Sequence, residues 1–157
     1  MTVTRQAAEA DIPELVHLRA LLFETLGGEF FNPSPAEQGW RDALATVLVG
    51  HLSAPDVHVL VVDGTGGGLA ACGIGVVEQR LPSPHLPNGR VGTVLGVITE
   101  PAHRRRGHSR AIMTGLLDWF AGRDVARVDL HASPEGEPLY RALGFADHPD
   151  PALYWRP

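Results

Sequence analysis

The sequence predicts a mixed α+β fold, in which one mixed sheet carries helices on both faces. The expected elements follow the order β-α-α-β-β-β-α-β-α-β. Three consecutive strands joined by tight connections are typical of an antiparallel meander, whereas the strand–helix–strand unit after them should be parallel with a right-handed crossover. A sheet of this kind buries its two faces under helices.

Apolar runs and turn signals locate the strands. The apolar run 57–62 leads into the glycine-rich turn 63–68, which predicts a hairpin with residues 69–78 as its returning strand. Glycines within that returning strand indicate a bulge or a close backbone approach. The expected strands are, in order, residues 2–6, 57–62, 69–78, 90–99, 126–132 and 154–155.

Cap residues and apolar spacing locate the helices. Asp11 stands where an N-cap is expected, with Pro13 inside the first turn and Glu14 three residues later. Apolar residues then recur at helical spacing up to Leu26. Ser34 is the expected cap of the second helix. The expected helices are residues 11–26, 35–52, 111–121 and 133–143.

Length and composition fit a single domain spanning residues 1–157. The chain is 44% hydrophobic and 20% charged, as ordinary soluble proteins are. No apolar run reaches the about 18 residues of a membrane span, and the N-terminus lacks the pattern of a signal peptide. The single cysteine, Cys72, forms no internal disulfide, and residue spacing indicates no metal site. A cytoplasmic protein without membrane partners is therefore expected.

The most informative segment is a basic turn, residues 99–110, between an expected strand and an expected helix. It holds four arginines in a protein of net charge −5. A helix N-terminus offers unpaired N–H groups and the positive end of the helix dipole, and arginines add forked donors. The segment therefore predicts a site for a phosphate-bearing cofactor. The overall acidity argues against nucleic-acid binding through these arginines.

Two short motifs, separated by an expected strand, carry a family resemblance. The first is Arg104-Arg105-Arg106-Gly107-His108-Ser109, and the second is Leu139-Tyr140-Arg141-Ala142-Leu143-Gly144-Phe145. They resemble the acyl-CoA signature and the Leu-Tyr-x-x-Leu-Gly-Phe segment of the GCN5-related N-acetyltransferase (GNAT) superfamily. The resemblance covers nearly the whole chain. It implies a mostly antiparallel, twisted sheet of six to seven strands, acetyl-CoA as co-substrate and no metal.

By this resemblance, the amides of residues 105–110 hold the pyrophosphate of coenzyme A, helped by one or two arginines. Gly107 is expected there because a Cβ would obstruct the approach of backbone to phosphate. The strand 90–99 is expected to splay from the strand 126–132, so that main-chain groups of residues 97–99 bind the pantetheine arm and one amide polarises the thioester carbonyl. Ser133 falls where many relatives have an Asn that contacts the pantetheine, and a role as a helix cap explains Ser133 as well. The implied cofactor-binding residues are Val97, Ile98, Thr99, Arg104, Arg105, Arg106, Gly107, His108, Ser109, Arg110 and Ser133.

The resemblance also implies a general acid. Tyr140 matches the phenol that protonates the departing thiolate, since a phenol of pKa about 10 is a suitable donor to a thiolate of pKa about 8.5. The general base stays open. Glu78 on the preceding strand is the preferred candidate, followed by His131, Glu29 and Glu24. Deprotonation through waters, without a dedicated base, is an equal alternative.

The leading hypothesis is an N-acetyltransferase that moves an acetyl group from acetyl-CoA to a primary amine by direct attack. The amine belongs to a small molecule or to a peptide N-terminus, and its site is expected between residues 27–34, residues 78–90 and the C-terminal strand. The alternative is a catalytically weak module that binds acyl-CoA as a sensor or partner domain. The resemblance is compatible with a homodimer.

Overall fold

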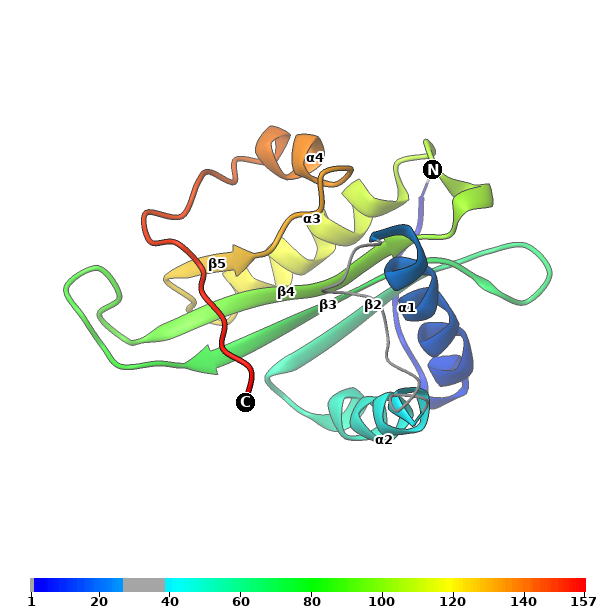
Figure 1. Ribbon diagram of the computed structural model, residues 1–157, viewed down its shortest axis with the longest axis horizontal. Helices are drawn as coiled ribbons and strands as arrows, with labels where there is room; N and C mark the ends of the chain where they lie inside the picture. Colours follow the sequence, from blue (N-terminus) through cyan, green and yellow to red (C-terminus); the bar gives the residue numbers. More distant parts are fainter. Residues whose placement is uncertain (1, 27–38) are drawn as a thin grey trace.

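The computed structural model of the protein describes residues 2–26 and 39–157 (Figure 1). The strands of this described part are β1 (Arg5–Gln6), β2 (Val57–Asp63), β3 (Leu69–Gln79), β4 (Arg90–Thr99) and β5 (Arg127–Leu130). Its α-helices are α1 (Ile12–Leu26), α2 (Trp40–Ser53), α3 (His108–Ala121) and α4 (Glu137–Ala142). None of the helices in these two ranges is long and apolar enough to cross a membrane.

The strands form one sheet in which spatial order follows chain order, β1-β2-β3-β4-β5. Pairing is antiparallel from β1 to β4 and parallel between β4 and β5. The mixed α+β fold and the meander are therefore confirmed, and β4 has the predicted bounds. The connection from β4 to β5 runs through α3, which is the predicted crossover unit.

Within the described residues, the sheet has fewer strands than the six or seven expected, because residues 154–155 are not part of a strand. Tyr154 is 72% exposed and Trp155 is 83% exposed. Pro149 and Pro151 precede them, and prolines lack the N–H group that a ladder requires. β5 is also shorter than expected, so the sheet ends on a four-residue strand.

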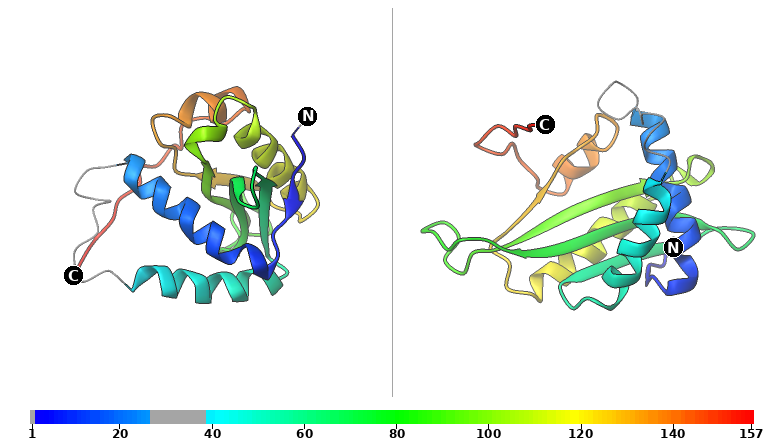
Figure 2. Two further views of the ribbon diagram at one scale, coloured as in Figure 1. Left: turned by 90° about the vertical axis from the view of Figure 1, so that its right-hand side faces the viewer. Right: turned by 60° about the horizontal axis from the view of Figure 1, so that its bottom comes forward.

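The two faces of the sheet carry different helices, as the two views of Figure 2 show. α1 and α2 pack on one face, around a cluster that includes Leu18, Leu48 and Val61. α3 packs on the other face through Ile112, Leu116 and Phe120. It lies close to the sheet because glycines face it: a Cβ on Gly92 would lie 2.6 Å from the Phe120 ring. The predicted close backbone approach is thus a helix-packing surface.

The entry to α1 differs from the predicted N-cap. Asp11 ends a 3₁₀ turn, Glu9–Asp11, and its carboxylate accepts a hydrogen bond from the amide of Ala8 at 2.7 Å. The same carboxylate pairs with Arg5, which also pairs with Asp63, both at 2.8 Å. The guanidinium of Arg5 holds the pKa of Asp11 below its usual value. Ser34, the expected cap of the second helix, lies outside the described residues.

β4 separates from β5 halfway along its length. The β4–β5 ladder ends at the pair Val94 and Leu130. On the other side of β4, the register with β3 shifts at a bulge, where Gly96 has a φ of +58°. A bulge bends the strand that contains it. The second half of β4 therefore runs away from β5 (Figure 1), as the resemblance implied.

Candidate active site

A cavity of about 490 Å³ opens where β4, the N-terminus of α3 and α4 meet. We call it the α3 cavity. It brings together most of the residues that the sequence singled out, although these residues come from three separate elements. Its lining consists of Leu22, Val97, Ile98, Thr99, Arg104, Arg105, Gly107, His108, Ser109, Arg110, Ser133, Pro134, Glu135, Gly136, Leu139 and Tyr140. Arg106 and Glu78 are the two predicted site residues that do not line it.

The α3 N-terminus presents unpaired backbone donors to this cavity. The first backbone bond of the helix runs from the amide of Ala111 to the carbonyl of Gly107. Among the described residues, the amides of His108, Ser109 and Arg110 have no backbone acceptor. The Ser109 hydroxyl lies 2.6 Å from the Thr99 hydroxyl, which ties the helix to the end of β4. These free amides and the helix dipole fit a phosphate group.

Gly107 caps α3 in the left-handed conformation, with a φ of +80°. A Cβ at this position would meet no protein atom within 4 Å. The need for glycine therefore comes first from the backbone angle, which L-residues with side chains disfavour by about 1–2 kcal/mol. The space above the glycine borders the α3 cavity, so a side chain would also intrude on whatever the amides bind.

The arginines of the basic turn occupy different places. Arg104, Arg105 and Arg110 line the cavity, and Arg104 lies 3.8 Å from Glu135 across it. Arg105 has a φ of +64°, so two of three consecutive residues at this turn are left-handed. Successive N–H groups in such a turn converge on an anion.

His108 is held beside the same turn. Its Nδ1 lies 3.2 Å from the hydroxyl of Thr2, in the N-terminal segment. Burial, followed by the charges of His103 and Arg106, holds the pKa of His108 below its usual value. The neutral imidazole is therefore favoured near neutral pH. His103 is engaged separately, with Nδ1 2.7 Å from Glu100.

The free edge of β4 forms the inner wall of the α3 cavity. Ile98 and Thr99 pair with Cys72 and Ala71 of β3 on one side. On the other side β5 has ended, and Val97, Ile98 and Thr99 face the cavity. An unpaired strand edge binds an extended chain through main-chain hydrogen bonds. The edge thus fits a linear amide-containing ligand arm.

Tyr140 reaches the cavity from α4, a helix of six residues. Its ring packs against Phe145 with centroids 6.1 Å apart. The ring also lies close to Gly136, where a Cβ would be 3.0 Å from it. Burial raises the pKa of the Tyr140 phenol above its usual value of 10.0. The phenol is therefore protonated at neutral pH and available as a proton donor.

Ser133 lines the cavity and begins the turn that precedes α4, which starts at Glu137 and not at residue 133 as predicted. Its hydroxyl accepts a hydrogen bond from the amide of Gly136 at 3.1 Å, and its carbonyl accepts one from Glu137 at 3.0 Å. This turn positions the helix that carries Tyr140.

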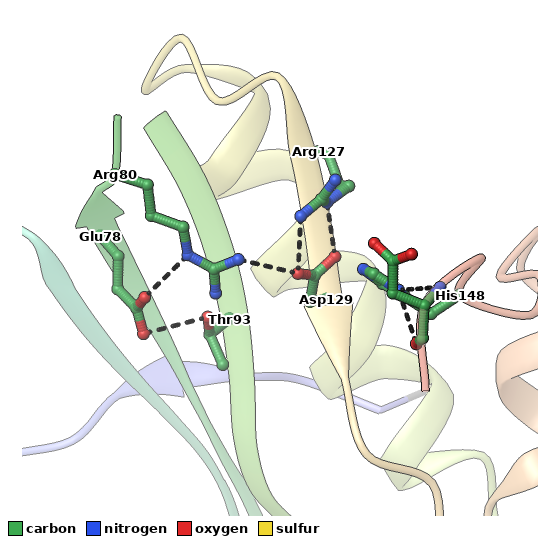
Figure 3. A network of polar contacts seen from close by, with 7 residues as sticks. Glu78, Arg80, Thr93, Arg127, Asp129 and His148 are labelled. Atoms are coloured by element: carbon green, nitrogen blue, oxygen red, sulfur yellow. Dashed lines mark hydrogen bonds and ion pairs between the residues drawn. The ribbon is translucent and has the colours of Figure 1, made fainter. Parts of the chain in front are cut away.

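Glu78 lies beside Arg80 and Thr93 (Figure 3) and does not line the α3 cavity. Its two carboxylate oxygens accept hydrogen bonds from Arg80 at 3.2 Å and from the Thr93 hydroxyl at 3.4 Å. Glu78 pairs with Val91, seven residues along β3 from the Ala71 that pairs with Thr99. That spacing corresponds to roughly 23 Å of strand. Arg80 also approaches Asp129 of β5, at 3.5 Å.

The other base candidates are no better placed. His131 and Glu24 are exposed and do not line the α3 cavity. Glu29 lies outside the described residues. No group of three or more potential metal ligands occurs in the described ranges.

Two residues of α1, Leu22 and Arg19, lie at or near the site but were not predicted as site residues from the sequence. Leu22 of α1 lines the cavity, although its helical spacing indicated only a core residue. Arg19, one turn earlier on α1, points at the β4 bulge: a Cβ on Gly96 would lie 3.3 Å from its Nη1. The sequence signal that could have identified Arg19 is a charged residue within an otherwise apolar helical stripe.

The fold and the cavity define a mixed α+β protein suited to an elongated ligand that carries phosphate at one end. A family model described as the acetyltransferase (GNAT) family matches residues 17–145. A curated relative, glucosamine 6-phosphate N-acetyltransferase 1 of Oryza sativa subsp. japonica, is 32% identical over 118 residues, which are 74% of this chain and 68% of the relative. The chain therefore belongs to the GNAT acetyltransferase family and is an N-acetyltransferase.

Solved structures show the same fold. A predicted acetyltransferase with acetyl-CoA from Clostridium acetobutylicum superposes with a TM-score of 0.84 at 21% identity, covering 98% of this chain and 96% of that one. A GCN5-related N-acetyltransferase from Ralstonia eutropha JMP134 gives 0.83 at 23% identity, with 99% of each chain covered.

Proposed function

We propose that the protein transfers the acetyl group of acetyl-CoA to a primary amine, carried by a small molecule or a peptide N-terminus, by direct attack. One observation carries the proposal: a single cavity joins the free amides of α3, the free edge of β4 and the phenol of Tyr140. The similar Clostridium structure contains acetyl-CoA. The rice relative is named for an amino sugar phosphate as acceptor.

Each part of the cavity takes one part of the co-substrate. The amides of residues 108–110 and the adjoining arginines hold the pyrophosphate, since they combine unpaired donors with positive charge. The edge of β4 at Val97, Ile98 and Thr99 holds the pantetheine arm as a neighbouring strand would. One main-chain amide of this edge donates to the thioester carbonyl and stabilises the charge that develops on its oxygen.

Tyr140 acts as the general acid. The amine nitrogen forms a bond to the acetyl carbon while the carbon–sulfur bond breaks and its electron pair leaves with the sulfur. The phenol of Tyr140 gives its proton to that sulfur and is reprotonated from solvent. The proton lost by the amine passes to solvent as well. The products are the N-acetylated amine and free coenzyme A.

Solvent is proposed as the proton acceptor in place of Glu78, because both Glu78 oxygens accept hydrogen bonds outside the α3 cavity. Glu78→Gln is therefore expected to change kcat/KM by less than about threefold, below the 10²–10⁴-fold typical of a lost general base. Steady-state kinetics between pH 6 and 9 would check this. Loss of the acidic limb of the pH profile together with a fall of about 100-fold would establish Glu78 as the base.

A thiol-release assay tests the proposed function. Acetyl-CoA is offered with amino sugars, amino acids, polyamines and short peptides, and released coenzyme A is detected with a thiol reagent. The protein adds little background, because burial raises the pKa of its only cysteine, Cys72, to about 12. Amine-dependent release is the expected result. Tight coenzyme A binding without release for any amine would favour the acyl-CoA-binding module.

A further inference from the structure

Arg19 is a partly buried arginine in the apolar stripe of α1. Its neighbours on that stripe, Leu15 and Leu18, belong to the core. Among the described residues no carboxylate pairs with Arg19, and burial lowers the pKa of its guanidinium, which stays charged at neutral pH. An unpaired cation in such a place costs free energy. Its retention calls for an anionic partner that the described chain does not supply.

Arg19 does not line the α3 cavity itself but lies beside residues that border it. Its Nη1 is next to Gly96, the bulge residue at which β4 leaves β5. The following residue, Val97, lines the cavity, and so does Leu22, one helical turn after Arg19. The phosphate-binding amides begin beyond Thr99, roughly 10 Å farther along β4. An anion bound by Arg19 would therefore be separate from the phosphates of coenzyme A.

The Arg19 guanidinium also contacts an aromatic ring. Its carbon lies 5.1 Å from the centroid of the Phe23 ring, an attractive cation–π contact. An aromatic ring does not replace a hydrogen-bond acceptor of the carboxylate kind, so the N–H groups of the guanidinium still lack an anionic partner among the described residues. Those groups match the two oxygens of a carboxylate or phosphate.

We infer that Arg19 binds an anionic group of the amine acceptor, so that the enzyme prefers amines bearing a phosphate or a carboxylate. The inference rests on the proposed function. Binding the anion at the β4–β5 split would hold the amine beside the thioester end of the cavity. The same positive charge disfavours acceptors that carry a second cationic group.

Calorimetry on the protein saturated with coenzyme A tests the inference without requiring turnover. Glucosamine 6-phosphate and glucosamine serve as a phosphate pair, and serine and serinamide as a carboxylate pair. The anionic member of at least one pair should bind at least about tenfold more tightly, as a charge-assisted hydrogen bond of 1.5–3 kcal/mol requires. The pair that discriminates identifies the anion, and equal binding within both pairs overturns the inference.

Two variants locate the effect. Arg19→Met should lose that discrimination and keep coenzyme A affinity, whereas Arg19→Lys should retain part of it. Arg123→Met is the matched control, because Arg123 stacks on Trp119 at 4.9 Å at the far end of α3. Equal weakening of both members of each pair by Arg19→Met would overturn the inference and leave Arg19 a packing role. If Arg19→Met does not fold, the wild-type comparison and Arg19→Lys still decide. If the protein binds the anionic amines more tightly but turns over none of them, the proposed function is refuted. The assignment of Arg19 as an anion-binding residue then still stands.

Discussion

Gly107→Val is expected to abolish coenzyme A binding, with at least about a 100-fold loss of affinity. Valine is β-branched and disfavours the φ of +80° that Gly107 adopts, so the backbone of the turn must change. The amides of residues 108–110 would then no longer point together into the cavity. The valine side chain would also enter the α3 cavity. Isothermal titration of coenzyme A into the variant is the measurement.

Gly66→Val is the matched control for Gly107→Val. Gly66 has a φ of +72° in the β2–β3 turn, and a Cβ there also meets no protein atom within 4 Å. Both variants should therefore lose similar stability, of about 1–2 kcal/mol. Only Gly107→Val should lose binding. Normal affinity in Gly107→Val would remove the α3 N-terminus as the pyrophosphate site, and equal loss in both variants would indicate a general folding defect.

Tyr140→Phe is expected to lower kcat by about 100-fold, the lower part of the range for a general acid. Phenylalanine keeps the ring contacts with Gly136 and Phe145. Only the proton donor is removed, so coenzyme A affinity should stay within about twofold. Stopped-flow or steady-state turnover together with calorimetry separates these two quantities.

The pH dependence of turnover gives a second test of Tyr140 as the general acid. Burial raises the pKa of the phenol above 10.0, so the protonated, active form persists through neutral pH and is lost only on the alkaline side. The advantage of wild type over Tyr140→Phe should therefore be constant from pH 6 to 9 and shrink above pH 10. An unchanged kcat at neutral pH would exclude Tyr140 from the mechanism.

Local sequence was sufficient for most of the fold. β4 was predicted with its observed bounds, and α3 starts at His108, one turn before the helix predicted from residue 111. Strand runs, glycine turns and helix caps act over a few residues, so they can be read along the chain. The mistaken strand at residues 154–155 has the opposite cause. Aromatic residues favour strands, but pairing requires a partner edge, and the prolines before them interrupt it.

The candidate site divides in the same way. The sequence by itself indicated the proposed donor side, because the basic turn and the segment around Tyr140 are each a contiguous motif that resembles the family's. The proposed acceptor side depends on the tertiary structure alone. Strand register placed Glu78 far along β3, engaged with Arg80 and Thr93, and helix packing brought Arg19 to the β4 bulge. Register and packing depend on contacts between segments far apart in the chain, which no local pattern records.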